Sequence, residues 1–129
     1  MLESGADILD LGACSTRPGS DSISEEEEWK RLEPALNILA SEHAGVKISI
    51  DTFRPAVVSR AFDIIGPFIV NDVSGGSEEM WSLLGRLHLP YIAMHTRGTP
   101  KNMQSLTDYD NVTEAVREFF VGIAAEADR

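Results

Sequence analysis

The chain has 129 residues and a formal net charge of −10, with 43% hydrophobic and 25% charged residues. This length is enough for one ordinary domain, and the composition is typical of a soluble globular protein. So acidic a surface repels phosphate backbones and anionic lipids, which argues against nucleic-acid and membrane partners. The sequence also has neither a long apolar span nor a signal peptide at its start, and its single Cys14 fits a reducing compartment. We therefore expect a cytoplasmic protein.

Strand and helix patterns alternate along the chain. Apolar or β-branched runs predict four buried parallel strands, at residues 6–13, 46–50, 68–70 and 91–94. Apolar residues at helical spacing predict four helices, one beginning after Ser24 and the others at 54–65, 77–88 and 111–128. The sequence therefore predicts an α/β fold built from four consecutive βα units.

The first predicted helix has a clear start signal. Ser24 and Glu27 have the spacing of a capping box, and the acidic run Glu25–Glu28 complements the helix dipole. We interpret this run as a solvated helix start and not as a metal site. Pro34 lies inside the helical pattern and predicts a kink or a restart there.

Polar residues follow every predicted strand, at the edge where α/β folds bind their ligands. These segments are Ser15–Gly19, Asp51-Thr52, Asn71-Asp72 and His95-Thr96. Thr16 and Arg17 suit an anionic group, because a guanidinium offers a rigid fork of donors that matches phosphate or carboxylate. The alternative for this segment is a simple surface turn. The histidine we interpret as structural.

Asp51 and Asn71 are candidates for binding a heterocycle. A carboxylate at the end of an apolar strand needs donors, and adjacent ring N–H and amino groups supply two. The alternatives are that Asp51 caps the helix near Arg54 and that Asn71 bonds to loop backbone. We expect Asp72 to orient the turn at 74–76. The sequence has no H-x-x-H, C-x-x-C or G-x-x-x-x-G-K pattern, so zinc and P-loop chemistry are poorly supported.

Taken together, these segments resemble dihydropteroate synthase in both order and spacing. The matching segments are Asp10-Leu11-Gly12, Ser15-Thr16-Arg17-Pro18-Gly19, Ser49-Ile50-Asp51-Thr52, Asn71–Gly76, Met94-His95, Arg97–Pro100 and Met103-Gln104. The resemblance implies a (β/α)₈ TIM barrel that condenses 6-hydroxymethyl-7,8-dihydropterin pyrophosphate with p-aminobenzoate. The products are 7,8-dihydropteroate and pyrophosphate, in a step of folate biosynthesis that sulfonamides target.

The resemblance also implies roles for particular residues. Asp51 and Asn71 match the positions that bind the pterin. Thr16 and Arg17 match a mobile loop that closes over pyrophosphate and p-aminobenzoate, and Arg17 is the catalytic candidate. The family implies Mg²⁺ as cofactor, a cytoplasmic location and a homodimer for the full-length enzyme, although its Asn near the magnesium site has no match in this chain.

The sequence departs from the family pattern in two local places and one large one. Gly12-Ala13-Cys14 replaces a frequent Gly-Gly-Glu, and Thr96 replaces a frequent second Met. Residues 1–129 match strands two to five of the barrel, as one partial domain, without the first strand or strands six to eight. We expect such a chain to be inactive alone and, with two open edge strands and an apolar inner face, to associate.

Three other interpretations stay open. A methyltetrahydrofolate:corrinoid methyltransferase would use the same Asp51 and Asn71 contacts, but a methyl donor has no pyrophosphate for the Ser15–Gly19 loop to hold. A small flavodoxin-like binding or signalling domain would need an acidic pocket with a modifiable Asp, such as Asp10 or Asp51, or a phosphate loop after the first strand. It would also need a fifth strand, which the pattern does not predict. The third interpretation is a non-catalytic remnant that binds a partner.

Overall fold

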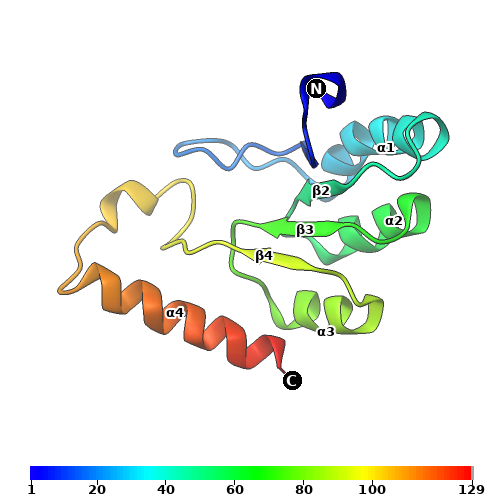
Figure 1. The fold of residues 1–129 in the computed structure, drawn as a ribbon. Coiled ribbons are helices and arrows are strands. Elements are labelled where there is room, and N and C mark those ends of the chain that lie inside the picture. Colours follow the sequence, from blue (N-terminus) through cyan, green and yellow to red (C-terminus); the bar gives the residue numbers. More distant parts are fainter. Residues whose placement is uncertain (129) are drawn as a thin grey trace.

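The computed structural model describes residues 1–128 and has four strands that alternate with helices (Figure 1). The strands are β1 (Leu9–Gly12), β2 (Ile48–Asp51), β3 (Ile69–Asp72) and β4 (Tyr91–Ala93). The helices are α1 (Glu25–Glu42), α2 (Pro55–Ile65), α3 (Glu78–Leu87) and α4 (Val112–Ala127), and single 3₁₀ turns lie at Leu2–Ser4 and Met103–Ser105. The predicted α/β fold of four βα units is confirmed. No helix in the described part of the chain is long and apolar enough to cross a membrane.

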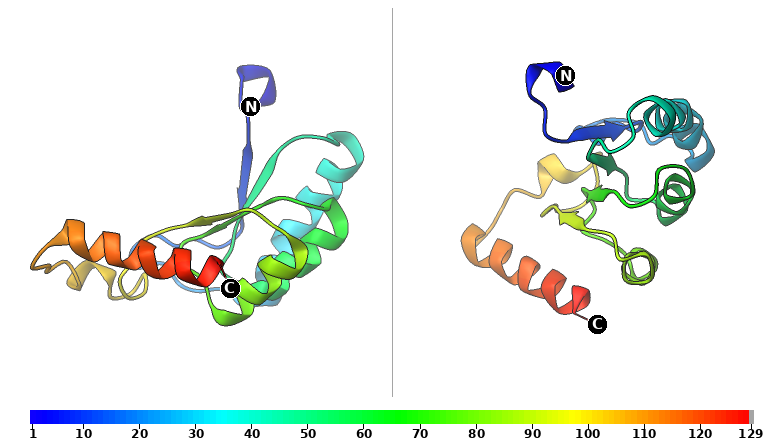
Figure 2. Two further views of the ribbon diagram at one scale, coloured as in Figure 1. Left: turned by 60° about the horizontal axis from the view of Figure 1, so that its bottom comes forward. Right: turned by 45° about the vertical axis from the view of Figure 1, so that its right-hand side comes forward.

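The four strands form one parallel sheet in the order β1-β2-β3-β4. Helices α1, α2 and α3 cover one face of this sheet, while α4 lies beyond β4 and continues the same circular path (Figure 2). Each strand is therefore added on the same side of the one before it, as in a barrel and unlike a doubly wound sheet, whose strand order reverses. Within residues 1–128, the outer edges of β1 and β4 pair with no further strand.

The core lies between the sheet and helices α1–α3. Ile50 and Val70 point from the middle strands toward the helices and are fully buried. The helices contribute apolar side chains from one face each: Trp29, Leu32, Leu36, Val57, Val58, Ala61, Met80, Leu83 and Leu84. By contrast, none of the α4 side chains is buried, so this helix is held by far less packing than the other three.

The predicted helix starts at Ser24 and Ser77 are confirmed by their caps. The Ser24 side chain accepts a hydrogen bond from the backbone N–H of Glu27 at 3.2 Å. Ser77 accepts one from the backbone N–H of Met80, also at 3.2 Å. The predicted restart at Pro34 is wrong, because α1 is one continuous helix from Glu25 to Glu42. Buried side chains on both sides of the proline hold the helix to the core and offset the lost backbone hydrogen bond.

The strand boundaries differ from the sequence prediction, and the differences at the first and third strands bear on the site. The other two strands, at 48–51 and 91–93, differ from the predicted 46–50 and 91–94 by one or two residues at an end. The first strand is shorter than the predicted 6–13, because β1 begins only at Leu9, where the backbone N–H donates to the Lys47 carbonyl oxygen at 2.9 Å. The third strand is longer, since β3 continues to Asn71 and Asp72. This extension places both residues within the sheet and not in the loop behind it.

Candidate functional site

Three residues at the carboxyl ends of neighbouring strands lie side by side across the sheet. The register pairs Gly12 with Asp51, and Asp51 with Asn71. Alternate residues of a strand face opposite sides, and Ile50 faces the helices. Asp51 and Asn71 therefore point to the sheet face turned away from α1–α3, which we call the open face.

Asp10 lies two residues before Gly12 and on the same face of the sheet, where it connects the neighbouring strands. Its Oδ1 accepts hydrogen bonds from the Ser49 hydroxyl and from the Asn71 side-chain amide, the latter at 3.4 Å. This amide hydrogen bond gives Asn71 a side-chain partner in place of the loop backbone that was the alternative. We call Asp10, Ser49, Asp51 and Asn71 the strand-end cluster.

Asp51 is the member of the cluster that lacks donors. Its carboxylate accepts no hydrogen bond from residues 1–128. Partial burial and the negative charges of Asp10, Glu28 and Asp72 raise the pKa of Asp51 above its ordinary value. Gly12 keeps the space beside it open, because a Cβ there would lie 3.2 Å from the Asp51 Cβ and 3.4 Å from its Oδ2.

This environment suits a ligand that donates hydrogen bonds. The alternative role for Asp51, capping α2, is wrong, since Arg54 is the residue at the N-cap position and no side chain caps that end. A half-buried carboxylate without a protein donor gains most from a group that presents two adjacent N–H bonds. The site can therefore bind a ring with an amidine-like edge.

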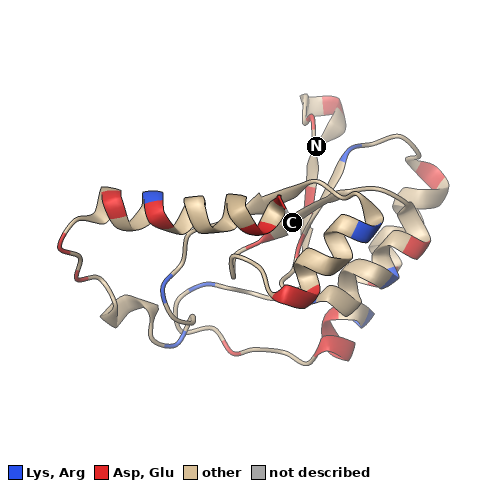
Figure 3. Ribbon diagram, turned by 90° about the horizontal axis from the view of Figure 1, so that it is seen from below, with Lys and Arg blue, Asp and Glu red and all other residues tan. Residues whose placement is uncertain are grey.

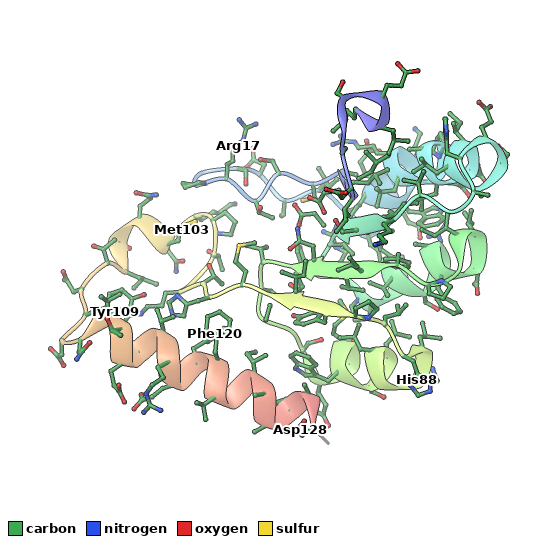
Figure 4. The ribbon with its side chains drawn as sticks, viewed as in Figure 1. Arg17, His88, Met103, Tyr109, Phe120 and Asp128 are labelled. Atoms are coloured by element: carbon green, nitrogen blue, oxygen red, sulfur yellow. The ribbon has the colours of Figure 1, made fainter. Side chains whose placement is uncertain are left out.

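The loop after β1, residues 13–24, carries Thr16 and Arg17. The Arg17 side chain is exposed, and its Nε donates to the Ser15 hydroxyl at 3.2 Å. The backbone N–H of Gly19 donates to the Pro100 carbonyl oxygen at 2.8 Å, which ties this loop to the loop after β4. Arg17 projects from the loop on the same side of the molecule as Met103 (Figure 4). The structure thus gathers Asp51 and Asn71 but leaves Arg17 without a bond to either.

A small apolar cavity lies between the loops that follow the four strands. Its volume is about 200 Å³, and its walls include Thr16, Phe53, Val73, Thr99, Pro100 and Met103. An apolar cavity of about 150 Å³ is enough for benzene, so this one has room for a single aromatic ring. A wider, open hollow of about 820 Å³ lies between residues 95–112 and does not include the strand-end cluster.

Basic residues are found in the same loops. Arg17 lies in the loop after β1, and Arg97 and Lys101 lie in the loop after β4 (Figure 3). Arg97 is already engaged, because its guanidinium lies over the Tyr109 ring at 4.5 Å and donates to the Asp108 carbonyl oxygen at 2.7 Å. In a chain of net charge −10, these three basic residues lie in loops at the carboxyl edge of the sheet.

Glu28 corrects the interpretation of the acidic run Glu25–Glu28. Its side chain is fully buried, although the residues before it at the helix start stay at least partly exposed. One carboxylate oxygen accepts from the Thr52 hydroxyl at 2.6 Å, and the other accepts from the Arg54 guanidinium. Glu28 is therefore not a solvated helix-start residue but part of a buried ion pair next to Asp51.

Two further predictions concern structural residues. Asp72 is fully buried and accepts from the backbone N–H of Ser74 at 2.7 Å, so its predicted role in orienting that turn is confirmed. It also accepts from the Tyr91 hydroxyl at 3.0 Å, and burial together with this carboxylate raises the pKa of Tyr91. His95 packs edge-on against Phe119 with ring centroids 5.0 Å apart, which fits the structural interpretation.

A metal site has less support in the geometry. Among residues 1–128, no group of three or more His, Cys, Asp or Glu side chains is arranged to hold a metal ion. Mg²⁺ is usually held by one or two carboxylates together with substrate phosphates, so it stays a prediction from the resemblance.

A family model described as "Pterin binding enzyme" matches residues 1–129, the whole chain. The chain belongs to this pterin-binding enzyme family. A dihydropteroate synthase of Neisseria meningitidis serogroup C is 43% identical over 98% of this chain and 44% of its own length. The resemblance to dihydropteroate synthase is thereby confirmed.

Solved structures of family members show the same arrangement of strands and helices. The Thermus thermophilus dihydropteroate synthase in complex with 4-aminobenzoate is 37% identical and superposes with a TM-score of 0.87 over 98% of this chain and 48% of that one. The Yersinia pestis enzyme, in a complex with a sulfonamide drug, is 32% identical with a TM-score of 0.88 over 98% and 45%. The chain thus spans less than half the length of these relatives, and its four βα units correspond to part of their barrel.

Proposed function

We propose that this chain is the pterin-binding portion of a dihydropteroate synthase. The complete enzyme would join 6-hydroxymethyl-7,8-dihydropterin pyrophosphate to p-aminobenzoate. The observation that carries the proposal is the strand-end cluster, in which Asp51 lacks a protein donor and lies beside an Asn71 held by Asp10. Family membership over residues 1–129 supports the same conclusion.

The pterin ring complements this cluster in its hydrogen-bonding groups. Its ring N–H and the adjacent amino group would donate to the two oxygens of the Asp51 carboxylate, in the manner of a guanidinium fork. The Asn71 amide uses one N–H on Asp10, which leaves its second N–H and its carbonyl oxygen for the edge of the ring. Gly12 leaves the open space in which the ring would lie against Asp51.

The proposed reaction needs positioning and charge stabilisation rather than a protein nucleophile. The bond between the pterin methylene carbon and the pyrophosphate oxygen breaks, and its electron pair leaves with pyrophosphate. The methylene cation then bonds to the p-aminobenzoate nitrogen, which loses a proton to water. Arg17 and Thr16 would stabilise the departing anion, because a guanidinium and a hydroxyl are both donors to phosphate oxygens.

The roles of the rest of the enzyme are also part of this proposal. Pyrophosphate carries several negative charges, and loop 13–24 contains one basic residue, Arg17, that could compensate them. We therefore propose that the 129-residue chain alone is inactive and that the complete enzyme brings further cations to the leaving group. We propose a cytoplasmic homodimer for that complete enzyme, which analytical ultracentrifugation would test.

Calorimetric titration with pterin-6-carboxylate tests the pterin site in this chain. We expect saturable binding that Asp51→Asn abolishes, since an amide presents one donor group to the N–H groups of the ring. Asp63→Asn is the matched control, because Asp63 is an exposed carboxylate on α2 outside the cluster. Absence of binding, or binding that Asp51→Asn leaves unchanged, would contradict the proposal.

A further inference from the structure

The burial of Glu28 calls for a role other than helix capping. A carboxylate in the first turn of a helix interacts with the dipole equally well from the surface, as Glu25 and Glu26 do here. Burying a carboxylate is unfavourable unless it is paired and hydrogen-bonded. Glu28 is 0% exposed, so its position is held by the partners around it.

Both partners come from one other segment of the chain, which in turn contacts a third. Through its two oxygens Glu28 binds the Thr52 hydroxyl and the Arg54 guanidinium, both in the connection between β2 and α2. A second nitrogen of the same guanidinium donates to the carbonyl oxygen of Ile23, close to the end of loop 13–24. Arg54 also donates from its backbone N–H to the Thr52 hydroxyl at 3.2 Å. We call Ile23, Glu28, Thr52 and Arg54 the Glu28 clamp.

The clamp continues directly into the strand-end cluster. Thr52 follows Asp51 in the chain, and its backbone N–H donates to the Asn71 carbonyl oxygen at 3.1 Å. Its side chain is 2% exposed and lies on Glu28. One residue thus connects the buried carboxylate to the two residues that face the proposed ligand.

The clamp also fixes the base of the loop that carries Arg17. Loop 13–24 is held at its far end by the bond from Arg54 to Ile23 and at its near end by Arg31, which donates to the Ala13 carbonyl oxygen at 3.3 Å. Between these two points the loop carries Thr16 and Arg17, and its Gly19 N–H donates to the Pro100 carbonyl oxygen at 2.8 Å.

We propose that Glu28 is a positioning residue that joins the base of loop 13–24 to the segment after Asp51, so that the anion-binding loop and the pterin-binding carboxylate keep a fixed relative position. The inference rests on the proposed function for its ligand. It goes further by assigning a role in the site to a buried residue that does not itself face the open side of the sheet.

Glu28→Gln tests the clamp with Glu26→Gln as its matched control. Both substitutions remove one negative charge from the first turn of α1. Glu26 pairs with Arg60 at 2.9 Å on the surface, whereas the buried Glu28 pairs with the partly buried guanidinium of Arg54. The third variant, Arg54→Lys, keeps a positive charge for Glu28 but removes the second branch that reaches Ile23.

Two readouts are needed, both accompanied by thermal melting. One is the affinity for pterin-6-carboxylate, and the other is amide hydrogen exchange in residues 15–23 and 52–54 without ligand. We expect Glu28→Gln to weaken binding by about tenfold and to accelerate exchange in both segments, because a hydrogen-bonded charge is lost. We expect Glu26→Gln to change neither and Arg54→Lys to accelerate exchange mainly in residues 15–23.

The outcomes separate this inference from the proposed function. A Glu28→Gln variant that melts at a lower temperature but keeps its affinity and its exchange rates in both segments would overturn the positioning role. If the unsubstituted chain binds no pterin, the proposed site fails in this chain, and the exchange comparison alone decides the clamp. Equal exchange in Arg54→Lys and the unsubstituted chain would overturn the link to loop 13–24.

Discussion

The two faces of the sheet are built from alternate residues of the same strands but have different environments. On the face packed against α1–α3, Ile50 and Val70 are fully buried in the core. On the open face, Asp51 and Asn71 lie beside Ile92, which is 47% exposed. One face therefore contributes mainly to the stability of the fold, and the other presents polar groups to a ligand.

This difference shows that the pairing register of the strands determines both which residues form the core and which form the site. A slip of one residue in the pairing of β2 and β3 would exchange the residues of the two faces. It would bury Asp51 and expose Ile50, so the packing that stabilises the fold also keeps the strand-end cluster aligned. Substitutions on the two faces should consequently have separable effects on stability and on binding.

The largest expected effect is on the buried face. Ile50→Ala should lower the free energy of unfolding by about 2–5 kcal/mol, since it removes a fully buried side chain and leaves a cavity. Ile92→Ala on the open face should change it by less than about 0.5 kcal/mol. Urea denaturation followed by circular dichroism measures both. Equal losses for the two variants would show that the open face is also part of a core.

Tyr91→Phe should have the next largest effect, also on stability. It removes the hydroxyl that donates to the buried Asp72 carboxylate and should cost about 1–3 kcal/mol. Because Tyr91 faces the helices beside Trp81, with ring centroids 4.7 Å apart, pterin affinity should stay the same. A loss of affinity without a loss of stability in this variant would break the separation of the two faces.

Gly12→Ala should act mainly on binding. The added Cβ would lie 3.2 Å from the Cβ of Asp51 and displace the carboxylate, so we expect affinity for pterin-6-carboxylate to fall about tenfold. Gly85→Ala is the control, since nothing lies within 4 Å of a Cβ built there in α3. The result would contradict our account if the two variants bound equally well.

The smallest expected effect is the pH dependence that Asp51 gives to stability. Its pKa is raised in the folded chain above the ordinary 3.8, so the folded state holds more protons than the unfolded state between these values. The ionisation of Asp51 therefore lowers the free energy of unfolding as the pH rises from the ordinary pKa to the raised one. Asp51→Asn removes it and should stabilise the ligand-free chain more at about pH 7 than at about pH 4. Parallel pH profiles for the two chains would contradict the raised pKa.

Local sequence patterns predicted the elements well because their causes are local. The Ser24 and Ser77 caps and the apolar runs of the strands depend on residues a few positions apart. The alternation of residues within strands also indicates a site residue that was not among those predicted, Asp10. Asp10 and Gly12, like Ser49 and Asp51, are two residues apart and must share a face, so the carboxylate at position 10 belonged with the candidates.

Other features of the site depend on contacts between distant segments. Asp10 and Asn71 are 61 residues apart, and no pattern in one strand indicates a bond to another. Helical spacing could have singled out Glu28 among the first-turn acids of α1, because it lies four and eight residues before the buried Leu32 and Leu36. Its pairing with Arg54, 26 residues later, has no such signal. These pairings follow from how α1 and α2 pack side by side on the sheet, which sequence periodicity does not specify.

The most direct test of the central claim is chemical-shift mapping by NMR during addition of pterin-6-carboxylate. We predict that the largest amide shifts fall at Gly12, Asp51 and Asn71, in the row across the open face. Shifts centred on the open hollow at residues 95–112, or on the helix-covered face, would place the ligand elsewhere and contradict the account.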